Sequence, residues 1–276
     1  MYKWFFAVFS CLILMISLHT YAYEPSFNKA SDVKPHELEG VGITPKIGEY
    51  VDLSTEFTDE SGESVTLGRY FNGSKPVIFS VVYYNCPSLC NFHLNGLTDT
   101  MKKLKWTVGD KFELVALTMN HREGYELAAQ KKQSYIDEYG RPESENGWHF
   151  LTGTEENIKK VADQVGFGFK WLDEQQEYAH ASAAIIMTPG GKISRYLNGI
   201  EFDKKDLRLA LLEASNGKIG NVVDQIVMFC FQFDPTKNKY SLYAFNLMRL
   251  GAGLMVLVLA IILIPMWIRE RKKKQA

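Results

Sequence analysis

The sequence predicts an α/β domain whose sheet has a parallel half and an antiparallel half, with helices packed on it. Nearly continuous apolar runs over 76–84 and 112–119 are typical of strands buried on both faces of a sheet. Apolar residues at helical spacing follow each of these runs. Further along, 183–187 and 193–197 flank a Pro-Gly-Gly turn and predict an antiparallel hairpin.

The other elements can be placed in chain order. Between 51 and 71, two short strand-like pieces flank a polar turn at 59–62. A short strand is predicted over 148–151, and helices are predicted over 89–106, 124–139, 155–165 and 203–214. The first helix is expected to bury Leu89, Phe92, Leu97, Met101 and Leu104. Strand, helix, strand, helix, then hairpin and helix is the thioredoxin order, so we expect a thioredoxin-like domain over 46–216.

Hydrophobic segments at both ends of the 276-residue chain leave room for one globular core. Lys3, an apolar stretch over 4–18 and a small-residue site at 20–22 predict a signal peptide over 1–22. An uncleaved signal anchor is the alternative, and either segment would export the domain after it. Residues 23–45 are polar, contain three prolines and predict a linker.

The C-terminal part is expected to anchor the domain in a membrane. After a juxtamembrane segment at 217–249, residues 250–268 form a run of 19 without a charge, enough to span a bilayer as a helix. The basic tail at 269–276 should stay in the cytoplasm. We therefore expect the domain on the periplasmic side of the inner membrane, with lipid as a partner. The net charge of −1 argues against a nucleic-acid partner.

Cysteine usage points to a redox or metal site. Cys11 falls in the signal segment, so the exported part holds Cys86, Cys90 and Cys230. Cys86 and Cys90 stand where the first buried strand turns into a helix, and a helix N-terminus favours thiolate over thiol. Residues four apart share a helix face, so both sulfurs can reach one ion or form a disulfide. A plain structural disulfide remains an alternative in an oxidising compartment.

His180 offers a third ligand. It lies just before a strand expected to run antiparallel to the strand that precedes Cys86. The start of an antiparallel strand and the end of a parallel one lie at the same sheet edge, so His180 should approach the cysteine loop. Two thiolates and an imidazole form a soft, three-coordinate set suited to copper. We predict a site for one copper ion per chain, Cu(I) or Cu(II), held by Cys86, Cys90 and His180.

Three further residues could take part in this chemistry. His93 follows Cys90 by three residues and is a candidate auxiliary ligand, although it is expected to point away from the site. His121 is expected in a solvated loop that borders the site. Cys230 is interpreted as apolar packing, because an unpaired cysteine behaves as a small hydrophobic side chain.

With these residues the chain resembles the SCO/SenC copper proteins that serve cytochrome c oxidase assembly. The resemblance spans roughly 43–213 and rests on the motifs VVYYNCPSLC at 81–90, WHFLTG at 148–153, HAS at 180–182 and MTPGGK at 187–192. It implies that Cys86, Cys90 and His180 bind copper. It also implies delivery of copper to the CuA centre of the oxidase, or reduction of that centre's cysteines before loading.

The chain departs from the family pattern at several positions. Asn91 stands where the family often has proline, and Ala179 stands where it often has aspartate. Residues 119–123 replace an Asp-Pro stretch. The expected C-terminal anchor also differs from the N-terminal anchor that is common in the family.

Two classes of function are compatible with the same residues. The first is a metallochaperone, which carries copper and need not be an enzyme, although thiol–disulfide reductase activity is compatible with it. The alternative is a membrane-tethered thiol–disulfide oxidoreductase or redoxin that uses Cys86 and Cys90 as a redox pair. Thioredoxin-type oxidoreductases carry a cis-proline just before the hairpin strand, whereas 178–182 contain no proline. That difference favours copper binding.

Overall fold

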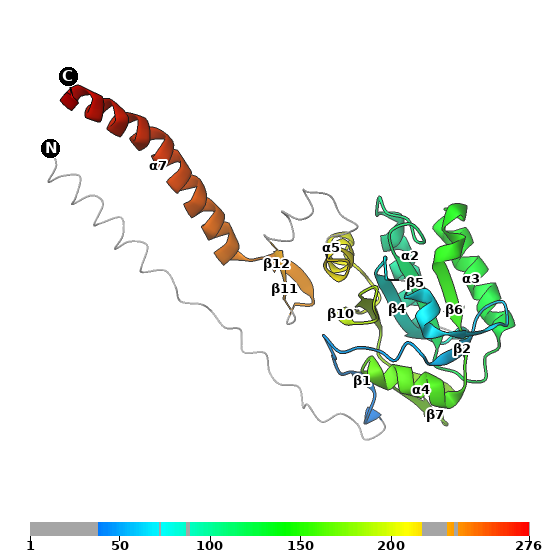
Figure 1. Cartoon of the computed structure of the whole chain (residues 1–276). Helices are drawn as coiled ribbons and strands as arrows, with labels where there is room; N and C mark the ends of the chain where they lie inside the picture. The colour runs from blue at the N-terminus through cyan, green and yellow to red at the C-terminus, as the bar shows by residue number, and fades with distance from the viewer. Residues whose placement is uncertain (1–37, 72, 87–88, 217–230, 235–236, 276) are drawn as a thin grey trace. The chain divides into compact units, whose positions relative to one another are not determined.

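The computed structural model describes residues 38–71, 73–86, 89–216, 231–234 and 237–275 (Figure 1). The predicted signal peptide at 1–22, most of the predicted linker, Cys11 and Cys230 lie outside the described residues. The chain divides into two compact units, Met1–Glu39 and Gly40–Ala276. Every element discussed below belongs to the second unit.

A five-stranded mixed sheet in the order β10-β9-β4-β5-β6 forms the centre of the domain. Its parallel half consists of β4 (Val77–Val82), β5 (Glu113–Thr118) and β6 (Trp148–Leu151). The hairpin β9 (Ala183–Met187) and β10 (Ile193–Asn198) adds the antiparallel half, with β9 paired to β4. Every residue of β4, β5 and β9 is buried, which explains why these strands read as continuous apolar runs. The predicted mixed sheet is confirmed.

Four helices pack on the sheets of the domain, and their ends follow from local sequence signals. They are α2 (Leu89–Lys102), α3 (Tyr125–Tyr139), α4 (Glu155–Gln164) and α5 (Lys204–Ala214). The α3 helix ends at Gly140, whose φ of 71° is the left-handed conformation that glycine adopts without strain. The α5 helix begins at Asp203, whose side chain accepts hydrogen bonds from two backbone N–H groups of the first turn. Figure 1 shows α2 and α3 side by side, in agreement with their contacts.

One side chain of α2 lies on the opposite face from the one predicted. Phe92 is 57% exposed, whereas His93 and Leu94 are buried. Cys90 is only 1% exposed, and it points toward the sheet. Since two residues along a helix turn the side chain by about 200°, an inward Cys90 places Phe92 on the solvent side. The expectation that Phe92 is buried was therefore wrong.

Smaller sheets flank the central one. The predicted hairpin near 59–62 is confirmed as β2 (Glu56–Thr58) and β3 (Ser64–Thr66). A second sheet, with the order β1-β7-β8, was not predicted; it contains β1 (Gly42–Ile43), β7 (Phe167–Leu172) and β8 (Glu177–His180). Glycine at position 168 allows β1 to approach β7, because a Cβ there would lie 1.9 Å from the Gly40 carbonyl oxygen. The β8 strand ends at His180, so this sheet determines where that side chain lies.

The predicted juxtamembrane segment contains a hairpin that sequence reasoning missed. Its strands are β11 (Phe231–Asp234) and β12 (Lys239–Leu242). Tyr240 joins it to α5, since its backbone N–H donates to Asp206 at 2.9 Å and its hydroxyl donates to Glu213 at 2.5 Å. The last element, α7, runs over Ala244–Gln275. Within the described residues, no helix combines the length and the apolar character needed to cross a membrane, so the predicted spanning helix over 250–268 is not confirmed.

Candidate metal centre

The two cysteines of the motif lie where β4 leads into α2. Cys86 follows the end of β4, and Cys90 occupies the first turn of α2; Pro87 and Ser88 lie outside the described residues. Both cysteines are present as thiols and both are buried. The backbone N–H of Cys90 donates to Cys86 Sγ at 3.3 Å, and that of Tyr83 donates to Cys90 Sγ at 3.4 Å. Such donors stabilise negative charge on sulfur, as expected at a helix N-terminus.

His180 reaches this pair from the end of β8, in the β1-β7-β8 sheet. Its Nε2 lies 3.3 Å from Cys90 Sγ, while its Nδ1–H donates to the carbonyl oxygen of Ala181 at 2.6 Å. The second contact fixes the tautomer and leaves Nε2 as the atom that faces the sulfur. Burial lowers the pKa of His180, which favours the neutral imidazole that a metal requires.

Aromatic side chains enclose the imidazole of His180. The Tyr83 ring meets it edge-on with ring centroids 6.1 Å apart, and the Phe167 ring stacks beside it at 6.2 Å. An apolar wall of this kind limits water access to a metal and holds the ring in place. Burial raises the pKa of the Cys90 thiol and outweighs the N–H donor from Tyr83, so in the metal-free protein this sulfur is a thiol at neutral pH and not the thiolate that a helix N-terminus favours.

The three predicted ligands form one cluster. The sulfurs of Cys86 and Cys90 and a ring nitrogen of His180 all lie within 4.8 Å of one another. Among the described residues, this is the one group of at least three histidine, cysteine or acidic side chains with such spacing. Two soft sulfur donors and one imidazole fit copper, and they leave no hard oxygen ligand for magnesium or calcium. The residues present can therefore hold a metal ion.

Glu123, which sequence reasoning did not single out, holds the cysteine loop. Its buried carboxylate accepts hydrogen bonds from the backbone N–H groups of Tyr84 and Asn85 at 2.9 and 2.8 Å. It also accepts the hydroxyl hydrogen of Thr118 at 2.5 Å. These bonds fix the backbone immediately before Cys86. The sequence signal for this role was that Glu123 is a lone acidic residue in 119–123. That stretch stood out in the sequence only as a departure from the family pattern.

His93 is not a ligand. Its ring is 2% exposed and lies in the core, with Nε2 3.0 Å from Ser80 Oγ and Nδ1 2.9 Å from Ser182 Oγ. Both ring nitrogens are engaged, so neither is left for a metal ion. His121 is exposed, as expected for a loop histidine. Burial lowers the pKa of His93 to about 4, so this ring is neutral at physiological pH.

The sequence model of the SCO1/SenC family matches residues 48–213, more than half of the chain. The chain belongs to the SCO1/SenC family. A putative electron transfer protein from Aquifex aeolicus VF5 resembles it with a TM-score of 0.54 and 23% identity, over 62% of this chain and 95% of that one. No curated protein sequence matches the chain.

Two structures solved with copper bound are also similar. Arabidopsis thaliana ScoI has a TM-score of 0.45 and 20% identity over 63% of this chain and 96% of its own. Yeast Sco1 has a TM-score of 0.43 and 21% identity over 58% of this chain and 83% of its own. The family assignment rests on the sequence match, and the likeness in fold rests on the Aquifex aeolicus structure with its TM-score of 0.54.

In this SCO1/SenC protein, Asn91 takes the place in which the family often has proline, and the structure gives it a role. Its side-chain amide donates to the carbonyl oxygen of Cys86 at 2.7 Å. Lys131 of α3 in turn donates to the Asn91 side-chain oxygen at 3.2 Å. Asn91 therefore ties the cysteine loop to α2 and, through Lys131, to α3.

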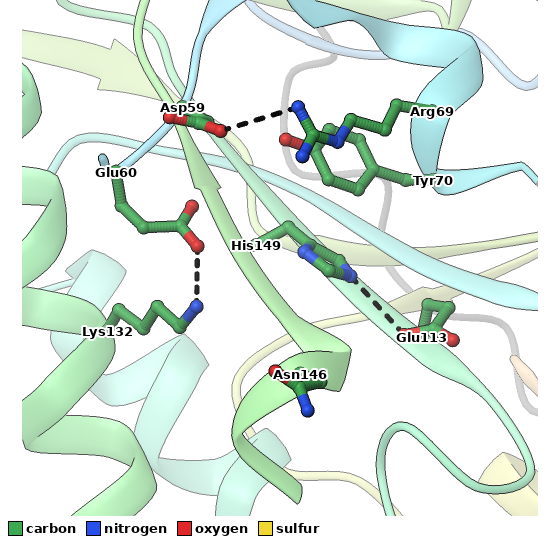
Figure 2. Close-up of a pocket in the computed structure, with 8 residues that line it drawn as sticks. All are labelled: Asp59, Glu60, Arg69, Tyr70, Glu113, Lys132, Asn146 and His149. Atoms are coloured by element: carbon green, nitrogen blue, oxygen red, sulfur yellow. Dashed lines mark hydrogen bonds and ion pairs between the residues drawn. The ribbon is translucent and has the colours of Figure 1, made fainter. Parts of the chain in front are cut away.

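A polar pocket of about 330 Å³ lies near the starts of the parallel strands β5 and β6, at the end of the sheet opposite the cysteine loop (Figure 2). Its lining includes Glu113 near the start of β5 and His149 in β6, which contact each other at 3.3 Å. Lys132 of α3 pairs with Glu60 at 2.5 Å, and Glu60 also accepts the backbone N–H of Phe150. These contacts join the β2–β3 turn to α3 and β6. None of the three predicted metal ligands lines this pocket, and we interpret it as a structural ion-pair network.

Proposed function

We propose that this chain is a copper-binding metallochaperone that holds one copper ion per chain and delivers it to the CuA site of cytochrome c oxidase during assembly. The carrying observation is the convergence of the Cys86 and Cys90 sulfurs with a His180 ring nitrogen within 4.8 Å. The family assignment supports the same function. Copper is the cargo in this proposal, so the site must both bind it and release it.

The chain's own groups suit such an exchange. His180 presents a neutral nitrogen, whereas Cys90 must lose its proton before it can bind a metal. Because burial raises the pKa of Cys90, copper uptake releases a proton and copper release restores a stable thiol. An acceptor that presents its own thiolates can therefore displace the ligands one at a time. A site with three protein ligands leaves room for the first incoming ligand.

The test is copper stoichiometry on the purified, reduced chain loaded with Cu(I). We expect one copper per chain, with binding lost in Cys86→Ser and greatly weakened but still measurable in His180→Ala. His121→Ala is the matched control, because it removes an exposed histidine outside the cluster. Equal copper retention in all four proteins would contradict the proposed site.

The second candidate is a thiol–disulfide oxidoreductase, because a buried cysteine pair at a helix N-terminus is also able to cycle between dithiol and disulfide. In that role the two thiols of Cys86 and Cys90 would become a disulfide while a partner disulfide becomes two thiols. Such a reaction on the cysteines of CuA would prepare that centre for loading. A chain that binds no stable copper, but oxidises and reduces its cysteine pair reversibly, would establish this function and reject the chaperone.

The location of the domain is part of the proposal. We place it on the periplasmic face of the inner membrane, with the membrane as a partner. Support comes from the signal-like segment at 1–22 and from the apolar run at 250–268, which precedes the basic tail. Protease added to intact spheroplasts should degrade the domain, whereas protection from the protease would contradict an exported location.

A further inference from the structure

His93 lies at the junction of the two chain segments that carry the proposed ligands. It follows Cys90 by one turn of α2, and its ring contacts Ser182, two residues beyond His180. Ser80 in the middle of β4 contacts the other side of the ring. One buried side chain thus connects the helix of Cys90, the central strand and the loop that follows His180.

The hydrogen bonds through this ring have one consistent direction. The Ser182 hydroxyl donates to the carbonyl oxygen of Gly199 at 2.9 Å, so its oxygen must accept from His93 Nδ1–H. The opposite nitrogen, Nε2, then accepts the hydroxyl hydrogen of Ser80 at 3.0 Å. The Nδ1–H also lies 3.4 Å from the carbonyl oxygen of Gly199, so this hydrogen is shared between that oxygen and the nearer Ser182 Oγ, and the ring is the neutral Nδ1–H tautomer.

The surroundings hold the ring in a single orientation. His93 is 2% exposed and Ser80 is 0% exposed, so water does not compete for the bond between them, whereas Ser182 is half-buried. The Phe202 ring meets the imidazole edge-on with centroids 5.4 Å apart. The chain after His180 is therefore anchored at Ser182, whereas His180 itself is part-buried and closes on Cys90 from the end of β8.

We propose that His93 is a positioning residue for the metal centre: through Ser182 it holds the His180 loop against the helix of Cys90, so that the imidazole meets the sulfurs at ligand distance. The inference rests on the proposed copper site and concerns how that site is held together. It assigns His93 a role distinct from that of a ligand. The hydrogen bond from Nδ1–H to Ser182 positions the loop, and the hydrogen bond from Ser80 to Nε2 anchors the ring to the sheet.

A double-mutant cycle tests this role. Cu(I) affinity of the reduced full chain is measured by competition with a chromophoric chelator for wild type, Ser182→Ala, His93→Leu and each of these combined with His180→Ala. We expect a 10- to 100-fold loss of affinity from either substitution when His180 is present, the range typical of lost outer-shell partners. In the His180→Ala background we expect a change within about 2-fold, because there is no imidazole left to position. Equal losses in both backgrounds, or no loss when His180 is present, would overturn the proposal.

Conservative variants separate positioning from packing. The Asn amide can stand in for Nδ1 and keep the bond to Ser182, whereas the Gln amide can stand in for Nε2 and keep the bond to Ser80. We expect His93→Asn to retain affinity within about 5-fold of wild type and His93→Gln to resemble His93→Leu. The reverse order would show that the anchor to the sheet, not the loop contact, is what matters, and would overturn the assignment.

A measurement that does not involve copper distinguishes a failure of the proposed function from a failure of the positioning role of His93. Alkylation of Cys90 by iodoacetamide, followed by mass spectrometry, should be faster in Ser182→Ala than in wild type, because a released loop uncovers the sulfur that His180 faces. Ser54→Ala is the control, since it removes a hydroxyl bonded only within its own turn to Asp52. If wild type binds no copper, the proposed function fails, and the alkylation rates still decide the inference. An unchanged rate in Ser182→Ala would overturn it.

Discussion

Replacing Glu123 with alanine removes the acceptor that holds the backbone before Cys86, and its cost can be worked from the structure. Three donors lose their partner: the N–H groups of Tyr84 and Asn85 and the hydroxyl of Thr118. Tyr84 and Thr118 are 1% and 0% exposed, so water does not replace the carboxylate there, while Asn85 is exposed. A buried donor left without an acceptor costs about 1–3 kcal/mol, which gives roughly 2–6 kcal/mol for the two.

Part of that cost is offset, because the variant no longer buries a charged carboxylate. We therefore expect Glu123→Ala to lower the free energy of unfolding by about 2–4 kcal/mol. Glu123→Gln should cost less, since one oxygen remains, yet at least one donor would then face the amide N–H₂. Thr118→Val should cost about 1–2 kcal/mol, because it removes one donor to Glu123 and the acceptor of the Asn120 N–H but leaves both backbone bonds to Glu123 in place.

The assay is urea unfolding of the purified protein, followed by tryptophan fluorescence, with Glu156→Ala as the matched control. Glu156 is an exposed acid in the first turn of α4. The copper affinity of each variant is measured in parallel, because a loosened loop should also weaken binding through Cys86. A loss in Glu123→Ala within about 0.5 kcal/mol of the control would refute the reasoning, since surface substitutions fall in that range.

Three further predictions concern the surrounding fold. The pKa of His93, which burial lowers to about 4, means that the unfolded chain takes up a proton below pH 6.5 while the folded chain does not. The free energy of unfolding should therefore be highest above pH 6.5 and should fall as the pH drops toward 4. His93→Gln should flatten this part of the pH profile. An unchanged slope in that variant would contradict the prediction. Gly96→Ala should cost at least about 1–3 kcal/mol in urea unfolding, because a Cβ there would lie 1.9 Å from the Ile200 carbonyl oxygen. Gly190→Ala is its control, with nothing within 4 Å, and equal midpoints for the two variants would rule out the proposed close approach. Tyr84→Phe should lower the thermal midpoint, because it removes a buried hydroxyl that reaches the Ala116 and Leu151 carbonyls, and the loss of one such hydrogen bond costs about 1 kcal/mol. An unchanged midpoint in calorimetry would show that the hydroxyl contributes nothing to stability.

Sequence reasoning worked best where one periodicity dominated. The apolar runs that became β4 and β5 have no polar face, so they indicated buried strands, and Gly140 marked the end of α3. It failed at Phe92, because apolar residues alone were used to choose the buried face of α2. It also missed the β7–β8 hairpin, whose strands are half-buried and contain polar residues.

By itself, the sequence determined the order of the central strands and of α2 to α5, and it paired Cys86 and Cys90 by their spacing on a helix. The topology rule then brought His180 to the same sheet edge. Only the tertiary structure decided which side chains hold that arrangement. Glu123 acts through Tyr84, and His93 acts through Ser182. Both partners are far away in the chain, so no local sequence pattern predicts these contacts. Buried polar groups must find hydrogen-bond partners wherever the fold places them, so their roles emerge only once distant segments are packed together.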